Sequence, residues 1–419
     1  MINLMQSIQI IDEKVDVKLN YEHYHKEEKG LIIMEHLLNP SVRNIQLSGI
    51  RTFFNTVSQY EDAISLTLGL PDFPTPDHIK SAAKKGIDAN KTVYSHNAGY
   101  FELREAACHF LKEKYQLSYN PEDEVIVTSG ASEAIDVTLR TILREGDEVI
   151  LPAPVYPGYA PVITMCKATP VFVDTREHGF KLTKKLMEEH VTEKTRCILL
   201  PYPSNPTGCT LSKSDLQEMA DYLSDKDLFI IADEIYSELT YDEKHTSIAS
   251  FPGMKEKTVV INGLSKSHAM TGWRIGFIFA PSYLCKHLIK VHQYNVSCAS
   301  TISQVAAIEA LTNGMDDALP MREEYKKRLT YTFSRLQEMG LPTTKPDGAF
   351  YIFPNISRFG LSSLNFATKL LEEHRIAVVP GSAFSEYGEG YIRISYAASM
   401  PLLEKGMDKL ETFIRSLES

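Results

Sequence analysis

From about residue 124 onward, short runs of apolar and β-branched residues alternate with segments of helical periodicity. The runs are apolar throughout, as is typical of strands in a parallel sheet that helices cover on both faces. This alternation predicts an α/β fold, a three-layer sandwich around a mostly parallel sheet. Strands are expected at 125–128, 148–151, 170–173, 196–200, 228–232, 258–261 and 275–280.

Beyond about residue 300 the pattern changes. The sequence becomes rich in helical periodicity, and its late strand-like runs lie at 349–353, 376–379 and 391–395. Such a mixture predicts a second, smaller α+β domain. Because no low-complexity linker separates the two parts, they are expected to pack closely.

The first 33 residues differ in composition from the rest of the chain. A strand-like run at 6–11 is interrupted by Asp12, Glu13 and Lys14, and residues 21–29 are polar and charged. No cationic stretch precedes an apolar one, so the segment does not have the pattern of a signal peptide. We expect residues 1–33 to be a disordered extension or to lie upstream of a natural start at Met34.

The composition excludes several classes of function. Hydrophobic residues make up 43% and charged residues 23% of the 419, which is typical of a globular domain. The net charge of −10 without a basic block argues against nucleic acid as a partner, and no apolar run is long enough to span a membrane. The six cysteines form no CxxC pair or metal-ligand cluster, so we expect a cytoplasmic protein without a bound metal.

Lys266 lies on a short connection between two expected strands, 258–261 and 275–280. Ligands of parallel sheets bind at such strand ends. An amine held among apolar groups beside a fixed cation has a lowered pKa and becomes a nucleophile toward carbonyl groups. Lys266 is therefore a candidate Schiff-base lysine with Arg274 as a phosphate-binding neighbour, although a lone lysine in a loop is more often on the surface.

Two further groups follow expected strands. Ser129-Gly130-Ala131-Ser132 opens a helix with small residues, which lets backbone N–H groups approach a phosphate. Asp233 follows the 228–232 run and either caps a helix or stays ionised against the protonated nitrogen of a pyridine ring. Tyr236, one turn later, can donate a hydrogen bond to the same ring's phenolic oxygen.

Two polar residues interrupt otherwise structural segments. Asn205 lies in a Pro-rich turn after the 196–200 strand and offers both a donor and an acceptor. Arg393 lies inside the apolar run 391–395, where a buried guanidinium requires a carboxylate from the protein or from a substrate.

Taken in order, these motifs resemble those of the class I, fold-type I pyridoxal-phosphate aminotransferases from about Asn39 to Leu417. The resemblance implies an N-terminal arm with part of the small domain at 34–77, a large pyridoxal-phosphate-binding domain at 78–300 and a small domain at 301–419. The matching motifs are Gly69–Phe73, Tyr94 with Gly99, Ser129–Ser132, Asn205–Gly208, Asp233–Tyr236, Ser265-Lys266 with Gly272–Arg274, and Tyr391–Arg393.

The resemblance also implies roles at the cofactor ring. Lys266 would form the Schiff base with pyridoxal 5'-phosphate and then move the substrate Cα proton. Asp233 would pair with the pyridine nitrogen, Tyr236 and Asn205 would hold the phenolic oxygen, and Tyr156 would stack on the ring.

The remaining roles concern the phosphate and the substrate. Gly130, Ala131, Ser132, Ser265 and Arg274 would surround the phosphate, and Tyr94 would reach it from the second subunit of a homodimer. Arg393, with Asn205 and the backbone of Gly69, would bind the substrate α-carboxylate, and Ile50 would line the side-chain pocket. The chain departs from the family pattern at Gly263, where many relatives have a phosphate-binding serine.

A narrower resemblance concerns the segments 48–51, 262–268 and 292–300, which are similar to those of N-acetyl-LL-diaminopimelate aminotransferases of the Bacillus type. It implies a ping-pong transfer between N-acetyl-LL-2,6-diaminopimelate and 2-oxoglutarate, with glutamate as the other amino acid, in lysine biosynthesis. The same core is compatible with an aromatic or aspartate aminotransferase, and a pyridoxal-phosphate C–S β-lyase is a second alternative. A non-catalytic regulator is disfavoured, because the N-terminal segment shows no helix-turn-helix pattern.

Overall fold

The computed structural model describes residues 34–47 and 49–418, and the chain divides into two units, Met1–Asn44 and Ile45–Ser419. The described part of the first unit holds a 3-10 turn, η1 (Glu35–Leu37), and a short helix, α1 (Pro40–Arg43). Asn39 caps α1 by accepting a 3.0 Å hydrogen bond from the Ser41 N–H. The expected extension at 1–33 lies outside the described residues.

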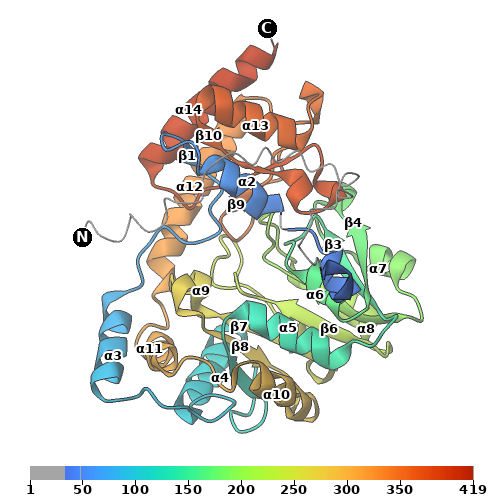
Figure 1. Ribbon diagram of the computed structural model, residues 1–419, viewed down its shortest axis with the longest axis vertical. Helices are drawn as coiled ribbons and strands as arrows, with labels where there is room; N and C mark the ends of the chain where they lie inside the picture. Colours follow the sequence, from blue (N-terminus) through green and yellow to red (C-terminus); the bar gives the residue numbers. More distant parts are fainter. Residues whose placement is uncertain (1–33, 48, 419) are drawn as a thin grey trace. The chain divides into compact units, whose positions relative to one another are not determined.

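A seven-stranded sheet forms the centre of the second unit (Figure 1). Every neighbouring pair is parallel except those of β8, which runs antiparallel to both β2 and β7. The expected α/β fold with a mostly parallel sheet is confirmed. In sheet order the strands are β2 (Val125–Thr128), β8 (Gly276–Phe279), β7 (Thr258–Gly263), β6 (Phe229–Asp233), β5 (Thr195–Leu200), β3 (Glu148–Ala153) and β4 (Thr169–Asp174).

Helices cover both faces of this sheet, because successive strand residues point to opposite sides. On β7, Val259 and Ile261 are buried in one hydrophobic cluster while Val260 is buried in the other. The first cluster contains α5 (Ala131–Ile142), α6 (Tyr159–Met165) and α10 (Ser282–Val296), and the second contains α3 (Asp77–Asp88), α4 (Phe101–Tyr115), α7 (Lys184–His190), α8 (Lys213–Leu223) and α11 (Thr301–Thr312). Ser212 and Asp215 form a capping box at the start of α8.

A third hydrophobic cluster joins the C-terminal helices to two small sheets. One sheet pairs β1 with β10 in parallel, and the other is antiparallel in the order β11, β12, β9. Residues from near the start of the second unit thus pack with its C-terminal end. The elements are α2 (Gly49–Val57), β1 (Ile64–Ser65), α12 (Ala318–Glu338), β9 (Tyr351–Ile352), α13 (Ser363–His374), β10 (Ile376–Ala377), β11 (Val379–Pro380), β12 (Ile392–Ser395) and α14 (Met400–Glu418).

Three details differ from the sequence-based expectations. The run 376–379 was expected as one strand but divides at Val378 into β10 and β11, which belong to different sheets. The strand expected to begin at 349 begins at Tyr351, because Ala349 adopts a φ of 56°, which a strand cannot accommodate. The helix that the sequence predicts near residues 156–167 is α6, which begins only at Tyr159, so that Tyr156 lies on the loop before it.

The division of the second unit into domains at residues 78 and 300 remains a prediction. Helix α11 begins at Thr301, and its Ala306, Ala307 and Ala310 are buried in the cluster that covers the large sheet. This packing favours a large domain that extends beyond residue 300.

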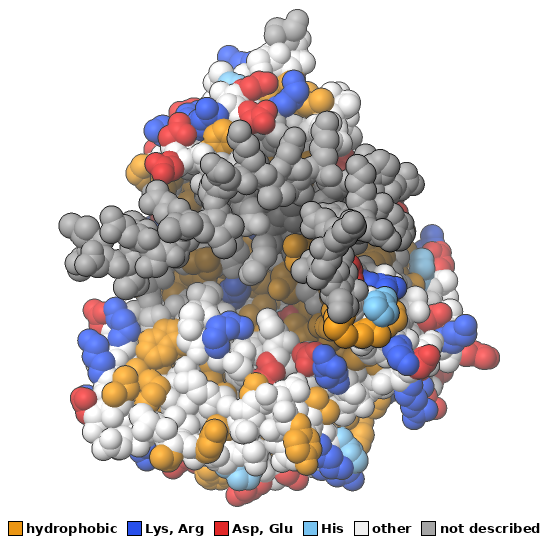
Figure 2. Space-filling model, viewed as in Figure 1, with side chains coloured by type: hydrophobic (Ala, Val, Ile, Leu, Met, Phe, Trp, Pro, Cys, Tyr) orange, Lys and Arg blue, Asp and Glu red, His pale blue; other side chains and the backbone are white. Residues whose placement is uncertain are grey.

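The described surface mixes charged and apolar side chains, and Figure 2 shows hydrophobic groups between acidic and basic ones over the region of α3 and α11. Several large apolar side chains are exposed, among them Val93, Tyr94 and Tyr294. Among residues 34–47 and 49–418, no helix has the length and apolar character needed to cross a membrane.

Candidate active site

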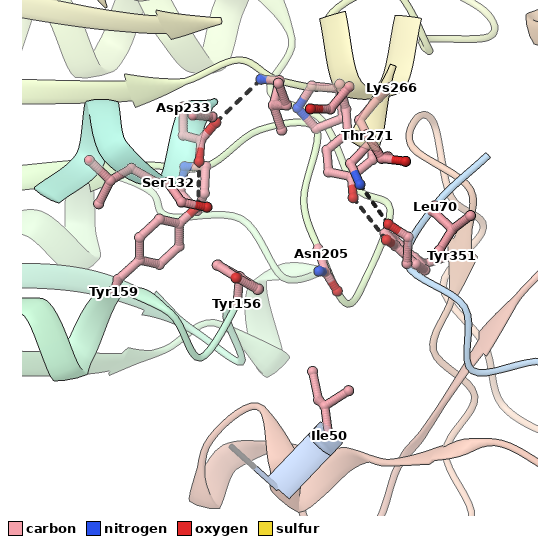
Figure 3. Close-up of a pocket in the computed structure, with 18 of the residues that line it drawn as sticks. Ile50, Leu70, Ser132, Tyr156, Tyr159, Asn205, Asp233, Lys266, Thr271 and Tyr351 are labelled. Atoms are coloured by element: carbon pink, nitrogen blue, oxygen red, sulfur yellow. Dashed lines mark hydrogen bonds between the residues drawn. The ribbon is translucent and has the colours of Figure 1, made fainter. Parts of the chain in front are cut away.

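A cavity of about 380 Å³ lies at the carboxyl ends of the parallel strands of the second unit (Figure 3). Its walls come from the ends of β2, β3, β5, β6 and β7 and from segments that pack with the C-terminal helices. The lining residues are Ile50, Thr67, Gly69, Leu70, Ala131, Ser132, Ile135, Tyr156, Tyr159, Pro201, Pro203, Asn205, Asp233, Ile235, Tyr236, Ser265, Lys266, Thr271, Arg274, Tyr351 and Arg393.

Lys266 extends into this cavity from α9 (Leu264–Ser267), the short helix that follows β7. Its Nζ donates a 2.5 Å hydrogen bond to the carbonyl oxygen of Gly69. Burial, together with the guanidinium groups of Arg393 and Arg274, lowers the pKa of Lys266 to about 8. The site therefore makes this amine a much better nucleophile near neutral pH than an exposed lysine.

Asp233 ends β6 and is buried, with an exposed fraction of 6%. Its carboxylate accepts a 2.8 Å hydrogen bond from the Tyr159 hydroxyl and a 3.3 Å bond from the Ile235 N–H. Burial raises the pKa of Asp233 to about 6, although both hydrogen bonds favour its ionised form. The alternative role of helix N-cap is wrong, because the residues after Asp233 form turns and no helix begins there.

Tyr159 was not predicted from the sequence. It lies in the first turn of α6, and its ring packs edge-on to that of Tyr156 at 5.4 Å. The available signal was its place just after a strand end, only three residues beyond the predicted site residue Tyr156.

Tyr236 and Tyr351 meet through their hydroxyl groups, which lie 2.8 Å apart. Burial raises the pKa of Tyr236 well above its usual value, so its phenol stays protonated and can donate a hydrogen bond into the cavity. Tyr351, on β9, was also missed. No local pattern marks it, because its place in the site depends on how two sheets pack.

Arg393 is the largest fully buried side chain of the described residues, with an exposed fraction of 2%. Its Nη1 donates to Asn205 Oδ1 at 2.9 Å and its Nη2 to the Thr67 carbonyl oxygen at 2.6 Å. Its Nε has no hydrogen-bond partner among the described residues. No carboxylate of the residues that the structure describes pairs with this guanidinium, which also keeps a free donor and is therefore suited to bind an anionic ligand.

The opposite end of the cavity is suited to a phosphate. Gly130 is the N-cap of α5 at a φ of 84°, and a Cβ added there would lie 2.5 Å from Arg274 Nη2. The absence of a side chain thus lets the Arg274 guanidinium approach the start of the helix, where the first N–H groups have no partner within the helix. Ser132, in the first turn of α5, and Ser265, next to Lys266, also line the cavity.

The structure brings together twelve of the fourteen site residues that the sequence predicted. The other two, Gly130 and Tyr94, do not line the cavity: Gly130 directly precedes the lining residue Ala131, and Tyr94 has an exposed fraction of 84%. In Figure 3, Ile50 reaches the cavity from α2, across from Lys266. Gly263 has a packing reason for lacking a side chain, since a Cβ there would lie 3.0 Å from the Ile275 carbonyl oxygen.

Comparison with known proteins gives one consistent result. The family model for aminotransferase class I and II matches residues 61–410. A Bacillus subtilis protein described as a probable N-acetyl-LL-diaminopimelate aminotransferase is 60% identical over 381 residues, covering 91% of this chain and 96% of its own. The aspartate aminotransferase of Pyrococcus abyssi is 44% identical, covering 90% of this chain and 97% of its own. The crystal structure of an aromatic aminotransferase from Pyrococcus horikoshii superposes with a TM-score of 0.83 at 43% identity, covering 87% of this chain and 99% of its own.

The cavity also fits the cofactor of this family, pyridoxal 5'-phosphate. An aldehyde requires a neutral amine, a pyridinium nitrogen requires a buried carboxylate, and a phosphate requires cations and free N–H groups. Lys266, Asp233 and the Gly130–Arg274 corner provide these groups on different walls of one cavity. The chain belongs to the class I and II aminotransferases and is a pyridoxal-phosphate-dependent transaminase.

Proposed function

We propose that this transaminase moves an amino group between N-acetyl-LL-2,6-diaminopimelate and 2-oxoglutarate by a ping-pong mechanism, with glutamate as the second amino acid, in lysine biosynthesis. The substrate assignment is supported by the 60% identity to the Bacillus subtilis relative described by that activity. Aspartate and aromatic amino acids are the alternatives, since relatives at 44% and 42% identity are named for them.

The arrangement of Arg393 beside Lys266 is the observation that carries the proposal. An α-amino acid presents a carboxylate one carbon away from its amino group. Arg393 offers a free donor to the substrate carboxylate. Its charge also contributes to the lowered pKa of Lys266, the amine that must exchange with the substrate amino group. Both groups line the same cavity.

In the proposed mechanism, Asp233 stays ionised against the ring nitrogen, and Tyr236 and Asn205 donate to the phenolic oxygen. Tyr156 would lie against the ring, while Ala131, Ser132, Ser265 and Arg274, which line the cavity, would hold the phosphate. When bound, the cofactor provides an electron sink for the pair left at the substrate Cα. Lys266 Nζ would act as the general base that takes the substrate Cα proton and later gives it back.

A homodimer is part of the proposal. Tyr94 is 84% exposed next to the exposed Val93, and Tyr294 is 85% exposed. These exposed apolar side chains are available to be covered by a second subunit. In a dimer, Tyr94 of one subunit would reach the phosphate in the cavity of the other. Sedimentation velocity of the parent protein measures whether it is a dimer. Tyr94→Phe keeps the aromatic ring but loses the hydroxyl, so it should remain a dimer while its affinity for the cofactor falls.

We also propose a cytoplasmic location. All six cysteines have free thiols in the structure, which is typical of proteins in a reducing compartment. Cell fractionation with an antibody to the native protein tests this, and recovery outside the cytoplasmic fraction would contradict it.

The substrate is tested by recording the absorption of the loaded enzyme while single amino donors are added: N-acetyl-LL-diaminopimelate, glutamate, aspartate and phenylalanine. We expect the first two to bleach the yellow band and 2-oxoglutarate to restore it. Bleaching by aspartate or phenylalanine alone would overturn the substrate while leaving the transaminase intact. Pyruvate and ammonia formed from cystathionine without a keto acid would instead indicate a β-lyase.

Lys266→Ala tests the role of the lysine. The loss of the general base should lower turnover at least ~10²–10⁴-fold, and the cofactor should no longer be linked covalently. Near-normal turnover of this variant would contradict the assignment.

A further inference from the structure

A buried pair outside the cavity, Glu133 and His292, has no role in the chemistry described so far. The carboxylate Oε1 of Glu133 lies 2.8 Å from His292 Nδ1, and the side chains are 10% and 0% exposed. A buried ion pair rarely stabilises a fold more than apolar residues of the same size would. Its presence therefore calls for another reason.

The position of Glu133 gives that reason. It is the third residue of α5, the helix whose N-terminus forms the phosphate end of the cavity, and its Oε2 accepts a short hydrogen bond from the Ser129 N–H. A carboxylate here orders the Ser129–Ser132 turn. Left alone, however, it would place a negative charge beside the phosphate, where repulsion and competition for the helix dipole would weaken binding.

His292 removes this conflict. Its Nδ1 faces the Glu133 carboxylate and its Nε2 lies 2.9 Å from the Asn97 carbonyl oxygen. Because both nitrogens face oxygen atoms, the ring is placed to donate a hydrogen bond to the Glu133 carboxylate as well as to the Asn97 carbonyl. The pair then has no net charge, and Glu133 can hold the turn without opposing an anion.

The second contact of His292 ties the same unit to the segment of Tyr94. The Asn97 side chain donates a 2.7 Å bond to the Ser297 carbonyl oxygen at the end of α10. Asn97 lies three residues after Tyr94. The contacts form a continuous chain from the Ser129 N–H through Glu133 and His292 to residue 97.

We propose that His292 is a positioning residue that neutralises Glu133, so that the N-terminus of α5 is both ordered and free to bind the cofactor phosphate. The proposal rests on the proposed placement of the phosphate at Ser132 and Arg274. It assigns a function to a residue that does not line the cavity.

The test uses the full-length protein freed of cofactor, with pyridoxal 5'-phosphate as one probe and inorganic phosphate as a competing second probe. We expect His292→Gln to raise the dissociation constants of both about tenfold, because the Glu133 charge is left uncompensated. Glu133→Gln should bind both at least as tightly as the parent, and the double variant should recover to within about threefold of it. A purely structural role predicts the opposite sign for Glu133→Gln.

His78 provides a matched control. Its two nitrogens lie 2.9 Å from Glu309 and 2.7 Å from Asp317. Like His292 it therefore contacts a carboxylate, but it does so away from the cavity. His78→Gln should lower the melting temperature and leave both dissociation constants unchanged.

Two results would overturn the proposal. One is phosphate binding by His292→Gln within about twofold of the parent, and the other is weakened binding by Glu133→Gln, which is decisive even if His292→Gln does not fold. A parent that binds the cofactor but transaminates none of the donors would refute the proposed function and leave this inference standing.

Discussion

The hydroxyl of Tyr159 donates a 2.8 Å hydrogen bond to Asp233 Oδ2 and thereby joins the first turn of α6 to the end of β6. The two residues are 74 positions apart. This bond opposes the effect of burial, which raises the pKa of Asp233 to about 6. Tyr159 thus helps to keep Asp233 ionised, the form in which this carboxylate is proposed to pair with the cofactor ring nitrogen.

Tyr159→Phe should raise the pKa of Asp233 further, because the ionised form loses a donor while burial is unchanged. Affinity for a protonated ring nitrogen falls as pH decreases through the pKa of the carboxylate, so in the variant this loss should begin at a higher pH. A charge-assisted hydrogen bond is worth about 1.5–3 kcal/mol, which corresponds to a roughly tenfold or greater loss of cofactor affinity near pH 6. Titration of cofactor binding between pH 5 and 8 measures both effects.

Tyr156→Phe is the control for that experiment, since it removes a hydroxyl from the neighbouring ring without breaking a bond to Asp233. Equal pH profiles for the two variants would show that the Tyr159 bond has no effect on Asp233.

The pKa of Lys266 predicts how the cofactor-free protein takes up an aldehyde. Only the neutral amine reacts, and a pKa lowered to about 8 means that its fraction rises with pH through 8 and then levels off. Stopped-flow absorption of pyridoxal 5'-phosphate uptake between pH 6 and 10 should therefore show a plateau above about pH 9. A rate that still climbs at pH 10, as for an exposed lysine, would contradict the lowered pKa.

Arg393→Gln should weaken the recognition of the substrate carboxylate. Removing one partner of a buried, hydrogen-bonded charge pair costs about 2–5 kcal/mol, so kcat/KM for an α-amino acid should fall at least about 30-fold. Arg393→Lys keeps the positive charge but loses the planar guanidinium that contacts Asn205 and Thr67. Its kcat/KM should therefore lie between those of the parent and of Arg393→Gln. The reaction of an alkylamine without a carboxylate is the control, and an equal loss for that amine would argue against carboxylate binding.

Gly130→Ala tests the approach of Arg274 to α5. The added Cβ would meet Arg274 Nη2 at 2.5 Å and Cζ at 2.9 Å, so the guanidinium must move away from the phosphate end. We expect cofactor affinity to fall and stability to decrease by about 1–3 kcal/mol from the φ of 84°.

Gly146→Ala is the matched control, because Gly146 has a φ of 87° but open space around its Cα. It should lower the melting temperature by a similar amount and leave cofactor affinity unchanged. If both variants lose cofactor affinity equally, the loss comes from backbone strain and not from displacement of the Arg274 guanidinium.

Helix and strand types were largely predictable, because the large sheet consists of strands that are apolar on both faces and follow one another along the chain. The same regularity placed Asp233, Asn205 and Lys266, since residues that follow parallel strands meet at one edge of the sheet. In the small sheets, where strand pairing is less regular, the prediction of a single strand at 376–379 was wrong. Nothing in the run 376–379 shows that β10 pairs with β1 while β11 pairs with β12.

The sequence by itself determined which groups this site contains: a lysine and a carboxylate at strand ends, a glycine-opened helix with an arginine nearby, and an arginine inside an apolar strand. Only the tertiary structure decided what tunes these groups. Tyr236 meets Tyr351 across 115 residues, Lys266 meets Gly69 across 197, and Arg393 meets Thr67 across 326. Local sequence patterns reach a few residues along the chain, whereas pKa values and hydrogen-bond partners depend on whatever surrounds a group in space.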